Sequence, residues 1–425
     1  MAEAAARSVL ISQIGTLALV PPGPVPGARM AEVPMLHNAA MLLRDGRIAW
    51  FGPEREIPLE EGATLISALG GTVIPGLIDP HTHIPFAGDR SGEFMQRLSG
   101  ETYLSILEGG GGIRSTCRAV RSATLEELVA ENLPRLQRML EYGVTRVECK
   151  SGYGLTPEDE LKQLDAIREL GRLQPIDLTP TYLGAHAVPE EFDGRPDEYI
   201  ETIGSPALLG EIAERGLARF CDVFCDRGAF DVTQARRLLV RAREAGLQLK
   251  IHADELAQIG ASKLAGELGA VSADHLELIG DDGIAALQSS GTIPIVLPGT
   301  SFFLGISPCN ARRLIQAGLP MALATDFNPG SCMIESLPLI MNIACCQLRL
   351  LPAEVLVACT ANAAAALDVQ RHAGAIEVGF DADLVVLDAP SLEAWFYKPG
   401  RPRVRAVIKG GHVVWRRPDH GLATV

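Results

Sequence analysis

The chain has 425 residues, which fits one large domain of about 250 residues together with a smaller appended one. Its 47% hydrophobic and 21% charged residues are typical of a globular protein with a sizeable core. The formal net charge of −14 argues against a surface that binds nucleic acid, because such surfaces depend on many basic phosphate contacts. A few cations in a pocket would still suffice for a small anionic substrate.

Residues 8–20 are apolar enough to raise the question of an export signal. They alternate in polarity, contain Gln13 and lack a basic leading region, which predicts a β-strand instead. No apolar run reaches the roughly 20 residues that span a bilayer, so we expect no membrane contact. The nine cysteines are scattered, with none in a CxxC pair, and we expect reduced thiols in the cytoplasm.

The two ends of the chain share a hairpin pattern. Residues 40–51 form two strand-like runs around an Asp-Gly turn, and residues 383–388 and 404–415 repeat the pattern near the C-terminus. We expect one small β-sandwich domain built from residues 1–74 and 373–425. The alternative is two unrelated β extensions.

Between these ends, β-branched runs alternate with helical stretches, which predicts an α/β fold with a parallel sheet. Eight alternations favour a closed (β/α)₈ barrel over residues 75–372 rather than an open sheet. The eight expected strands are 72–79, 144–149, 177–184, 218–224, 247–252, 270–275, 292–297 and 320–325.

The segment 84–143 is too long for a simple loop, so we expect one or two helices over the barrel mouth. Its glycine run 109–112 lacks the Gly-Lys-Ser/Thr of a phosphate-binding loop and fits a lid hinge better. Arg114, Arg118 and Arg121 have the spacing of one helical face, which we interpret as a solvated face.

Barrel enzymes place their chemistry at the C-terminal ends of the strands, and histidines gather there in this chain. Of the nine histidines, the following lie at predicted strand ends: His81, His83, His186, His252 and His275. Two histidines at i and i+2 on extended backbone point to one face, so His81 and His83 can reach the same ion. Five satisfied core histidines on one rim would be an improbable coincidence.

We therefore expect a metal held by His81, His83, His252 and Asp326. Nitrogen and carboxylate ligands without cysteine suit Zn²⁺ or Fe²⁺ better than Mg²⁺ or Ca²⁺. Such a metal lowers the pKa of a coordinated water so that hydroxide exists near neutral pH. His275 is interpreted as a neighbour that orients water or Asp326 rather than as a ligand.

These residues match the amidohydrolase superfamily, which the chain resembles through His-x-His after strand one, His after strands five and six, and Asp after strand eight. In binuclear members a carbamylated Lys or a Glu after strand four bridges two metals. Here strand four ends in Asp222-Val-Phe-Cys-Asp-Arg227, with neither residue in that place, so one metal is expected. Cys225 is interpreted as a packing residue.

Within the superfamily, nearly the whole chain resembles the imidazolonepropionase family. The motifs that carry the resemblance are Pro75-Gly-Leu-Ile-Asp-Pro-His-Thr-His83, Lys150-Ser-Gly-Tyr-Gly-Leu155, Gly184-Ala-His-Ala-Val-Pro189, Lys250-Ile-His-Ala-Asp-Glu255, Leu297-Pro-Gly-Thr300 and Thr325-Asp-Phe-Asn-Pro-Gly-Ser331. His-x-His alone is specific only to the superfamily, whereas Lys-Ser-Gly-Tyr-Gly with Asp-Phe-Asn-Pro-Gly-Ser is much more specific. The run Phe86-Ala-Gly-Asp-Arg90 departs from the paired glycines usual in the family but keeps Arg90.

The resemblance implies an enzyme that opens a cyclic amide at a C–N bond, converting 4-imidazolone-5-propanoate to N-formimino-L-glutamate in histidine degradation. Activated water would attack the ring carbonyl, with one Zn²⁺ or Fe²⁺/Fe³⁺ in each subunit of a homodimer. It also implies that His186 contacts the carbonyl side of the ring. The other implied substrate contacts are Arg90, Tyr153, Glu255, Asn328, Gly330 and Ser331.

The general base is left open at this point. Glu255 lies three residues after His252 and is our first choice, Asp326 is the second, and His275 is the third candidate. A helix-start carboxylate is the structural alternative for Glu255. Two other functions are weighed: another mononuclear amidohydrolase acting on a cyclic amide or an aminated heterocycle, and a non-catalytic barrel, which the complete ligand set argues against.

Overall fold

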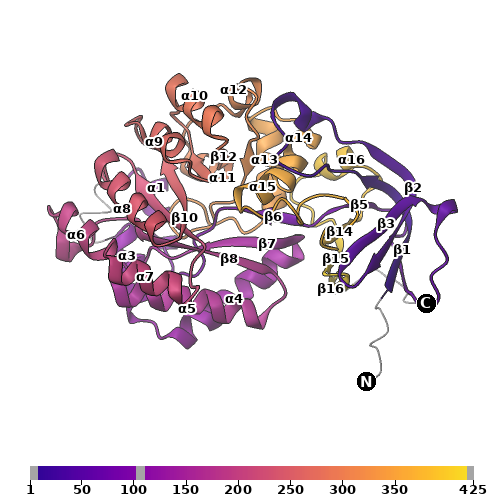
Figure 1. The fold of residues 1–425 in the computed structure, drawn as a ribbon, viewed down its shortest axis with the longest axis horizontal. Helices are drawn as coiled ribbons and strands as arrows, with labels where there is room; N and C mark the ends of the chain where they lie inside the picture. Colours follow the sequence, from indigo (N-terminus) through magenta and orange to yellow (C-terminus); the bar gives the residue numbers. More distant parts are fainter. Residues whose placement is uncertain (1–7, 102–110, 419–425) are drawn as a thin grey trace.

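Residues 8–101 and 111–418 are described by the computed structural model. They form a barrel wrapped by helices, and beside it a sheet to which both ends of the chain contribute (Figure 1). The strands of the two bodies form separate sheets of eight strands each. The barrel carries the candidate site.

The barrel strands are parallel and pair in chain order, as alternating β and α units predict. They are β6 (Leu77–Asp79), β7 (Val144–Lys150), β8 (Asp177–Ala185), β9 (Phe220–Cys225), β10 (Gln248–Ala253), β11 (Ser272–His275), β12 (Ile293–Val296) and β13 (Ala322–Leu323). The last strand returns to the first through the segments that follow them. There the Asp326 amide donates to the His81 carbonyl at 3.1 Å, and the His83 amide donates to the Phe327 carbonyl at 3.0 Å.

One expected strand, 72–79, is wrong as a single element. The structure divides it into β5 (Thr72–Pro75), which belongs to the terminal sheet, and β6, which begins the barrel. The break falls at Gly76, where an added Cβ would lie 2.3 Å from Thr145 Oγ1, so only glycine allows β6 to approach β7 this closely. Because the apolar run is continuous in the sequence, it gives no sign that the chain passes from one sheet to the other at this point.

The terminal domain joins both ends of the chain, which confirms one shared domain over two separate extensions. Its strands are β1 (Ser8–Ala18), β2 (Met35–Arg44), β3 (Arg47–Pro53), β4 (Thr64–Ser67), β5, β14 (Leu384–Leu387), β15 (Val404–Lys409) and β16 (His412–Arg416). The order is β16-β15-β14-β5-β1-β2-β3, with β4 also paired to β1. Backbone pairing therefore makes one mixed sheet where a sandwich is expected, because the long β1 pairs with β2 on one edge and with β4 and β5 on the other.

Helices cover the outside of the barrel (Figure 1). They are α1 (Ser91–Leu98), α3 (Ile113–Ser122), α4 (Leu125–Glu141), α5 (Pro157–Leu173), α6 (Pro196–Ile203), α7 (Pro206–Glu214), α8 (Val232–Glu244), α9 (Ala261–Leu268), α10 (Asp281–Ser290), α11 (Pro298–Leu304), α12 (Ala311–Gln316), α13 (Leu337–Gln347), α14 (Pro352–Ala358), α15 (Ala361–Ala366) and α16 (Leu392–Phe396). Three single turns are η1 (Gly27–Ala31), η2 (Glu54–Glu56) and η3 (Glu190–Phe192). Local sequence explains several starts: Thr124 and Glu127 form a capping box at α4.

The segment 84–143 holds α1, α3 and α4 among its described residues. Since α4 contacts β7 as a barrel helix, α1 and α3 are the additional helices that the length of the segment predicts. α1 contacts α11 through Phe94 and Phe303, whose ring centroids are 5.2 Å apart. Gly109 and Gly110 of the expected hinge lie outside the described residues, whereas Gly112 has φ 71° and immediately precedes α3.

All nine cysteines fall within the described residues, and all are free thiols. Cys225 is fully buried at the end of β9 and belongs to the barrel core, as a packing residue would. In the described parts of the chain, no helix combines the length and the apolar character needed to cross a bilayer.

Candidate active site

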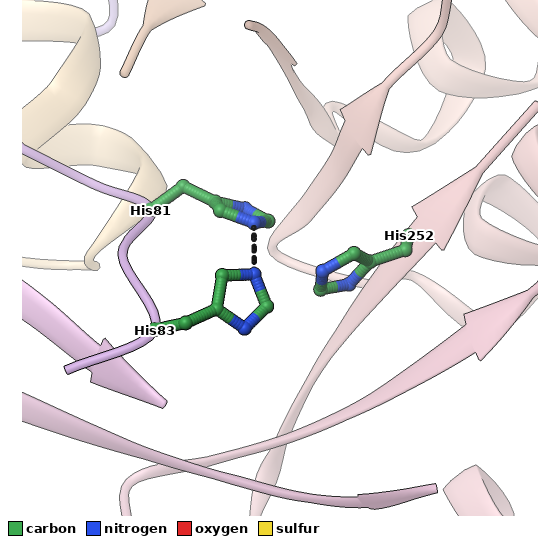
Figure 2. Close-up of side chains that lie close together, drawn as sticks. All are labelled: His81, His83 and His252. Atoms are coloured by element: carbon green, nitrogen blue, oxygen red, sulfur yellow. Dashed lines mark hydrogen bonds between the residues drawn. The ribbon is translucent and has the colours of Figure 1, made fainter. Parts of the chain in front are cut away.

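The four expected metal ligands converge at the rim of the barrel. His81 and His83 follow β6, and their Nε2 atoms are 3.3 Å apart (Figure 2). Asp326 Oδ1 lies 3.5 Å from the first of these nitrogens and 3.2 Å from the second. His252 comes from β10 on the opposite side, with its ring facing the pair and its centroid 4.6 Å from that of His81.

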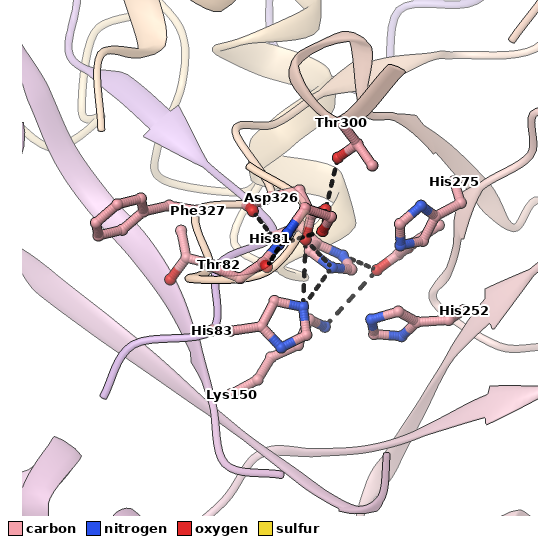
Figure 3. Close-up of polar contacts among 12 residues, drawn as sticks. His81, Thr82, His83, Lys150, His252, His275, Thr300, Asp326 and Phe327 are labelled. Atoms are coloured by element: carbon pink, nitrogen blue, oxygen red, sulfur yellow. Dashed lines mark hydrogen bonds and ion pairs between the residues drawn. The ribbon is translucent and has the colours of Figure 1, made fainter. Parts of the chain in front are cut away.

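His275, at the end of β11, lies in the same cluster (Figure 3). The ligand atoms of His81, His83 and His252 lie within 4.8 Å of one another, and the same holds for those of His81, His275 and Asp326. The structure therefore brings together the four expected ligands. It also places a ring nitrogen of His275 within 4.8 Å of the ligand atoms of His81 and Asp326. Its expected role beside the ligands stays a prediction.

The residues of this cluster fit a metal of the zinc or iron class. Buried nitrogens and oxygens lacking a hydrogen-bond partner concentrate here: His83 Nδ1, both ring nitrogens of His252, His275 Nδ1 and Asp326 Oδ1. Unpaired buried polar atoms are costly, so their convergence calls for a ligand that satisfies them. Imidazole and carboxylate donors without thiolate suit Zn²⁺ and Fe²⁺.

The electrostatics of the cluster favour the metal-binding form of two of its donors, His83 and Asp326. Burial lowers the pKa of His83 to about 4, which leaves its imidazole neutral at pH 7. Burial opposes the ionisation of Asp326, but the adjacent imidazoles of His81 and His83 outweigh it and hold the pKa of that carboxyl well below its usual range. A neutral imidazole and an ionised carboxylate are the forms that bind metals.

The backbone takes unfavourable conformations where it turns these side chains inward. Asp254, His275 and Asp326 have φ of 52°, 81° and 54°, in the left-handed region that residues other than glycine seldom adopt. Each such residue costs about 1–3 kcal/mol, and the surrounding structure must support it. All three lie at or shortly after the C-terminal ends of barrel strands.

Glu255 is buried beside this cluster, which suits a proton acceptor. Its Oε2 lies 3.6 Å from His275 Nδ1. Burial raises the pKa of the Glu255 carboxyl well above its usual value, with further contributions from the nearby charges of Glu277 and Asp326. The described helix after it, α9, begins only at Ala261, so the helix-start alternative for Glu255 is wrong.

Glu277 is a second buried carboxylate that the sequence reasoning missed. Its Oε2 lies 3.8 Å from His275 Nδ1, and Ser301 Oγ is 3.4 Å from its other oxygen. Burial raises its pKa to about 8. One feature of the sequence could have indicated this role: Glu277 lies two residues after His275, where the chain leaves β11.

His186 and Tyr153 line the other side of the histidine cluster. The His186 ring stacks on His83 with centroids 4.9 Å apart, and Tyr153 lies 5.2 Å from His186 by the same measure. His186 Nδ1 donates to the Gly152 carbonyl at 2.9 Å, which leaves Nε2 as the free ring nitrogen. Burial lowers the pKa of His186 well below its usual value, so this ring is neutral.

Arg90 reaches the site from the loop after β6. Its Nε and Nη2 donate to Glu93 Oε2 at 2.9 and 2.8 Å, and this contact fixes the direction of the guanidinium. An added Cβ at Gly330 would lie 2.5 Å from Arg90 Nη1, so the glycine and this nitrogen are in close contact. The loop after β6 and the loop after β13 therefore meet at this point.

The loop after β13 is held in shape by Asn328. Its Oδ1 accepts from the amides of Gly330 and Ser331, both at 2.8 Å, and its Nδ2 donates to Ser331 Oγ at 2.7 Å. Ser331 Oγ in turn lies 3.3 Å from Asp326 Oδ2. The expected substrate contacts on this loop are thus tied to a ligand of the candidate metal.

The basic helical face of α3 lies against an acidic segment. Arg114 pairs with Asp193 at 2.8 Å, Arg121 pairs with Glu191 at 2.5 Å, and Arg118 lies 3.7 Å from Glu190. Ion pairs at the surface contribute little free energy, and these arginines are compensated. This arrangement agrees with a solvated, structural face.

Comparison with known proteins now decides the family. The model of the Amidohydrolase family matches residues 72–414. The chain is 45% identical to an imidazolonepropionase of Brevibacillus brevis, covering 95% of this chain and 96% of the relative. It is 46% identical to an imidazolonepropionase of Alkaliphilus oremlandii, covering 92% and 93%. The chain belongs to the imidazolonepropionase family of amidohydrolases.

A solved structure supports the same fold. An adenosine deaminase from Xanthomonas campestris with bound zinc superposes with a TM-score of 0.72 over 96% of this chain and 92% of the deaminase. Identity is only 19%, so this likeness shows the fold alone. Membership of the imidazolonepropionase family rests on the sequence relatives, and the barrel with its terminal β domain is the fold expected from that resemblance.

Proposed function

We propose that this protein is a metal-dependent hydrolase that converts 4-imidazolone-5-propanoate to N-formimino-L-glutamate in histidine degradation. The observation that carries this proposal is 45% identity to curated imidazolonepropionases over 95% of the chain. The buried histidine and aspartate cluster at the barrel rim supports it, because breaking a cyclic C–N bond near neutral pH requires an activated water.

The proposed cofactor is one Zn²⁺ or Fe²⁺/Fe³⁺ in each subunit. His81, His83, His252 and Asp326 would hold it. When bound, such an ion acts as a Lewis acid and lowers the pKa of water at the site. A single ion is proposed because neither Lys nor Glu follows β9 in the place where binuclear relatives carry their bridging ligand.

We propose that Arg90 and Tyr153 hold the substrate. A guanidinium suits the propionate carboxylate because its N–H groups form a fork that matches two oxygens. Tyr153 lies beside the histidine cluster, with its ring centroid 6.0 Å from that of His83 and 5.2 Å from that of His186, where it can orient the five-membered ring. The loop residues Asn328, Gly330 and Ser331 complete the proposed contacts.

Glu255 is the proposed general base, and it moves a proton between water and a ring nitrogen. Its burial keeps the carboxyl pKa high, as a proton acceptor working near neutral pH requires. Asp326 is the second choice for this role, and His275, which lies between Glu255 and the ligands, would orient water or Asp326. His186 presents Nε2 to the ring carbonyl side of the substrate.

The test is product formation from synthetic 4-imidazolone-5-propanoate by purified, metal-loaded protein. N-Formimino-L-glutamate above a metal-only blank, abolished in His252→Ala, is the expected result. No product from this substrate would refute the specific activity. Release of ammonia from an aminated heterocycle instead would assign the chain to a different reaction of the same superfamily.

Three further expectations accompany this function as proposals. They are a homodimer, a cytoplasmic location and a division into residues 1–74, 75–372 and 373–425. Free thiols throughout the chain suit a reducing compartment. Sedimentation equilibrium of the purified protein tests the dimer, for which a mass of twice 45.3 kDa is expected.

A further inference from the structure

Beneath the candidate metal ligands lies a network of charged side chains to which the proposed mechanism assigns no role. It consists of Glu148 and Lys150 on β7, Asp222 on β9, Lys250 on β10 and Asp274 on β11. All five side chains are 0% exposed. Charges buried this deeply are expensive unless each is paired, so their presence calls for a function or a strong structural reason.

Asp274 controls which nitrogen of His81 faces the metal site. Its Oδ2 lies 2.6 Å from His81 Nδ1, and an ionised carboxylate can only accept a hydrogen bond. Nδ1 therefore carries the proton. Nε2 is the atom that approaches His83 and Asp326, and it is the nitrogen available to a metal.

Asp222 makes the equivalent contact with the ligand on the far side of the site. Its Oδ2 lies 3.0 Å from His252 Nδ1, an ion-pair distance. This contact is an ion pair rather than a hydrogen bond, and the negative charge beside Nδ1 favours the proton on that nitrogen, which leaves Nε2 for the metal site. Two ligands on strands that are not neighbours are thus oriented in the same way, each by one buried carboxylate.

Lys150 connects the two carboxylates. Its Nζ is 2.7 Å from Asp222 Oδ2 and 3.7 Å from Asp274 Oδ2, and these are the same two oxygens that face the imidazoles. It also lies 2.9 Å from Glu148 Oε2. Figure 3 shows Lys150 below the histidines, on the side away from Thr300. One ammonium group thus fixes both orienting carboxylates at once.

We propose that Lys150 is a positioning residue, which acts through Asp222 and Asp274 to hold His81 and His252 as Nδ1-protonated tautomers with Nε2 toward the metal. This inference rests on the proposed metal site. It adds to that site one buried cation, the ammonium group of Lys150, which supports two of the metal ligands through their orienting carboxylates. Outer partners of this kind typically contribute about 10- to 100-fold to metal affinity.

The test measures zinc affinity of the full-length protein by competition with a chelator of known affinity. Asp222→Asn and Asp274→Asn keep the side-chain shape and remove the charge, and Lys150→Met removes the shared cation. Each is expected to weaken zinc binding about 10- to 100-fold. Unchanged affinity in Lys150→Met, or in both aspartate variants, would overturn the inference.

Asp79→Asn is the matched control. Asp79 is an equally buried barrel carboxylate, but its oxygens accept from the amide and the hydroxyl of Thr325 rather than from an imidazole. Its substitution is expected to leave zinc affinity unchanged. A loss as large as that of Asp274→Asn would overturn the inference, since the effect would then belong to any buried charge in the barrel.

A second measurement needs no variant and so does not depend on their folding. Nitrogen NMR of zinc-loaded wild type, labelled at histidine, reports which ring nitrogen carries the proton. Nδ1 protonation of His81 and His252 is expected, and Nε2 protonation of either would overturn the inference. If the wild-type protein binds no zinc, the proposed function is refuted together with this inference. If it binds zinc normally but His81 or His252 is protonated at Nε2, only this inference is refuted.

Discussion

At the scale of single residues, the absence of a side chain at Gly330 leaves room for the guanidinium of Arg90. An added Cβ at Gly330 would lie 2.5 Å from the guanidinium, so Gly330→Ala must displace Arg90. Loss of a charged hydrogen bond costs about 1.5–3 kcal/mol, which corresponds to a rise in KM of about 10- to 100-fold. We expect kcat to change little, because Arg90 binds substrate away from the reacting bond.

Steady-state kinetics of Gly330→Ala and Arg90→Ala check this prediction, and both variants should move in the same direction. A fall in kcat at constant KM would contradict it, because that pattern would place Arg90 in transition-state stabilisation rather than in binding.

Glu255→Gln should have the opposite kinetic signature. The amide cannot accept a proton, so kcat is expected to fall by about 10²- to 10⁴-fold, the usual contribution of a general base. KM should change much less. Single-turnover measurements separate this effect from product release. If the variant keeps the full kcat, Glu255 is not the general base, and Asp326 or His275 must have that role.

The pH dependence of activity is expected to follow the pKa of Glu255, which burial and neighbouring charges shift. Burial, followed by the charges of Glu277 and Asp326, raises its pKa, and a base acts only when deprotonated. Activity should therefore rise as the pH increases through the raised pKa. Glu277→Gln removes the largest of the nearby charge contributions, so the rising limb of kcat/KM should move to lower pH. An unmoved limb would show that Glu255 does not control it.

The residues of the site differ in how far sequence could predict them. His81 and His83 were predictable because alternation on extended backbone places i and i+2 on one face. Lys150, Asp222 and Asp274 were not, because their roles depend on which strands lie adjacent across the barrel interior. Glu277 was missed because nothing in the local sequence shows that its carboxylate turns back toward His275.

At the scale of elements, the loop that carries Arg90 is anchored to α4. Asn132 Oδ1 accepts from the Phe86 amide at 3.2 Å, and its Nδ2 donates to the Phe86 carbonyl at 3.0 Å. Asn132→Ala leaves the buried Phe86 amide without this partner, while the carbonyl still accepts from Arg135, so the free energy of unfolding should fall by about 1–3 kcal/mol. KM should rise too, because the loop also positions Arg90.

Thr124→Ala is the control for this prediction. It removes the cap of the same helix and should cost about 1 kcal/mol without affecting KM. Chemical denaturation and steady-state kinetics on both variants decide the matter. Equal changes in KM would mean that general loss of stability, rather than the anchor, governs substrate binding.

Element boundaries were less predictable than element identities. All eight barrel strands were expected close to their observed positions, because alternating β and α patterns are strong signals. The split of residues 72–79 was not, since Gly76 changes sheets within an unbroken apolar run and only the packing against Thr145 reveals it.

At the scale of the whole molecule, the segment between β1 and β2 is bound to the barrel side of the molecule by buried contacts. Asn362, in α15 beside the barrel, accepts from the Val25 amide at 2.7 Å and donates to the carbonyls of Val25 and Met321. The sequence predicted that both ends share a domain but not the contacts between Val25 and Asn362, because these residues are more than 300 positions apart. The exact division into three ranges stays a prediction.

Metal removal should destabilise the whole molecule. A ligand that binds only the folded state adds about 2.7 kcal/mol of stability at a free concentration 100 times its Kd. Stripping the protein with a chelator should therefore lower Tm, and added Zn²⁺ should restore it. Calorimetry on stripped and reloaded protein checks this, and a Tm that does not respond to metal would contradict a structural contribution from the site.

The most direct test of the central claim is the rate of ring opening measured against metal occupancy. Stripped protein is reconstituted with increasing Zn²⁺ or Fe²⁺, and formation of N-formimino-L-glutamate from 4-imidazolone-5-propanoate is followed. We predict a linear rise that ends at one metal per chain. The absence of ring opening at every occupancy, or a rise that continues to two metals per chain, would contradict a mononuclear imidazolonepropionase site.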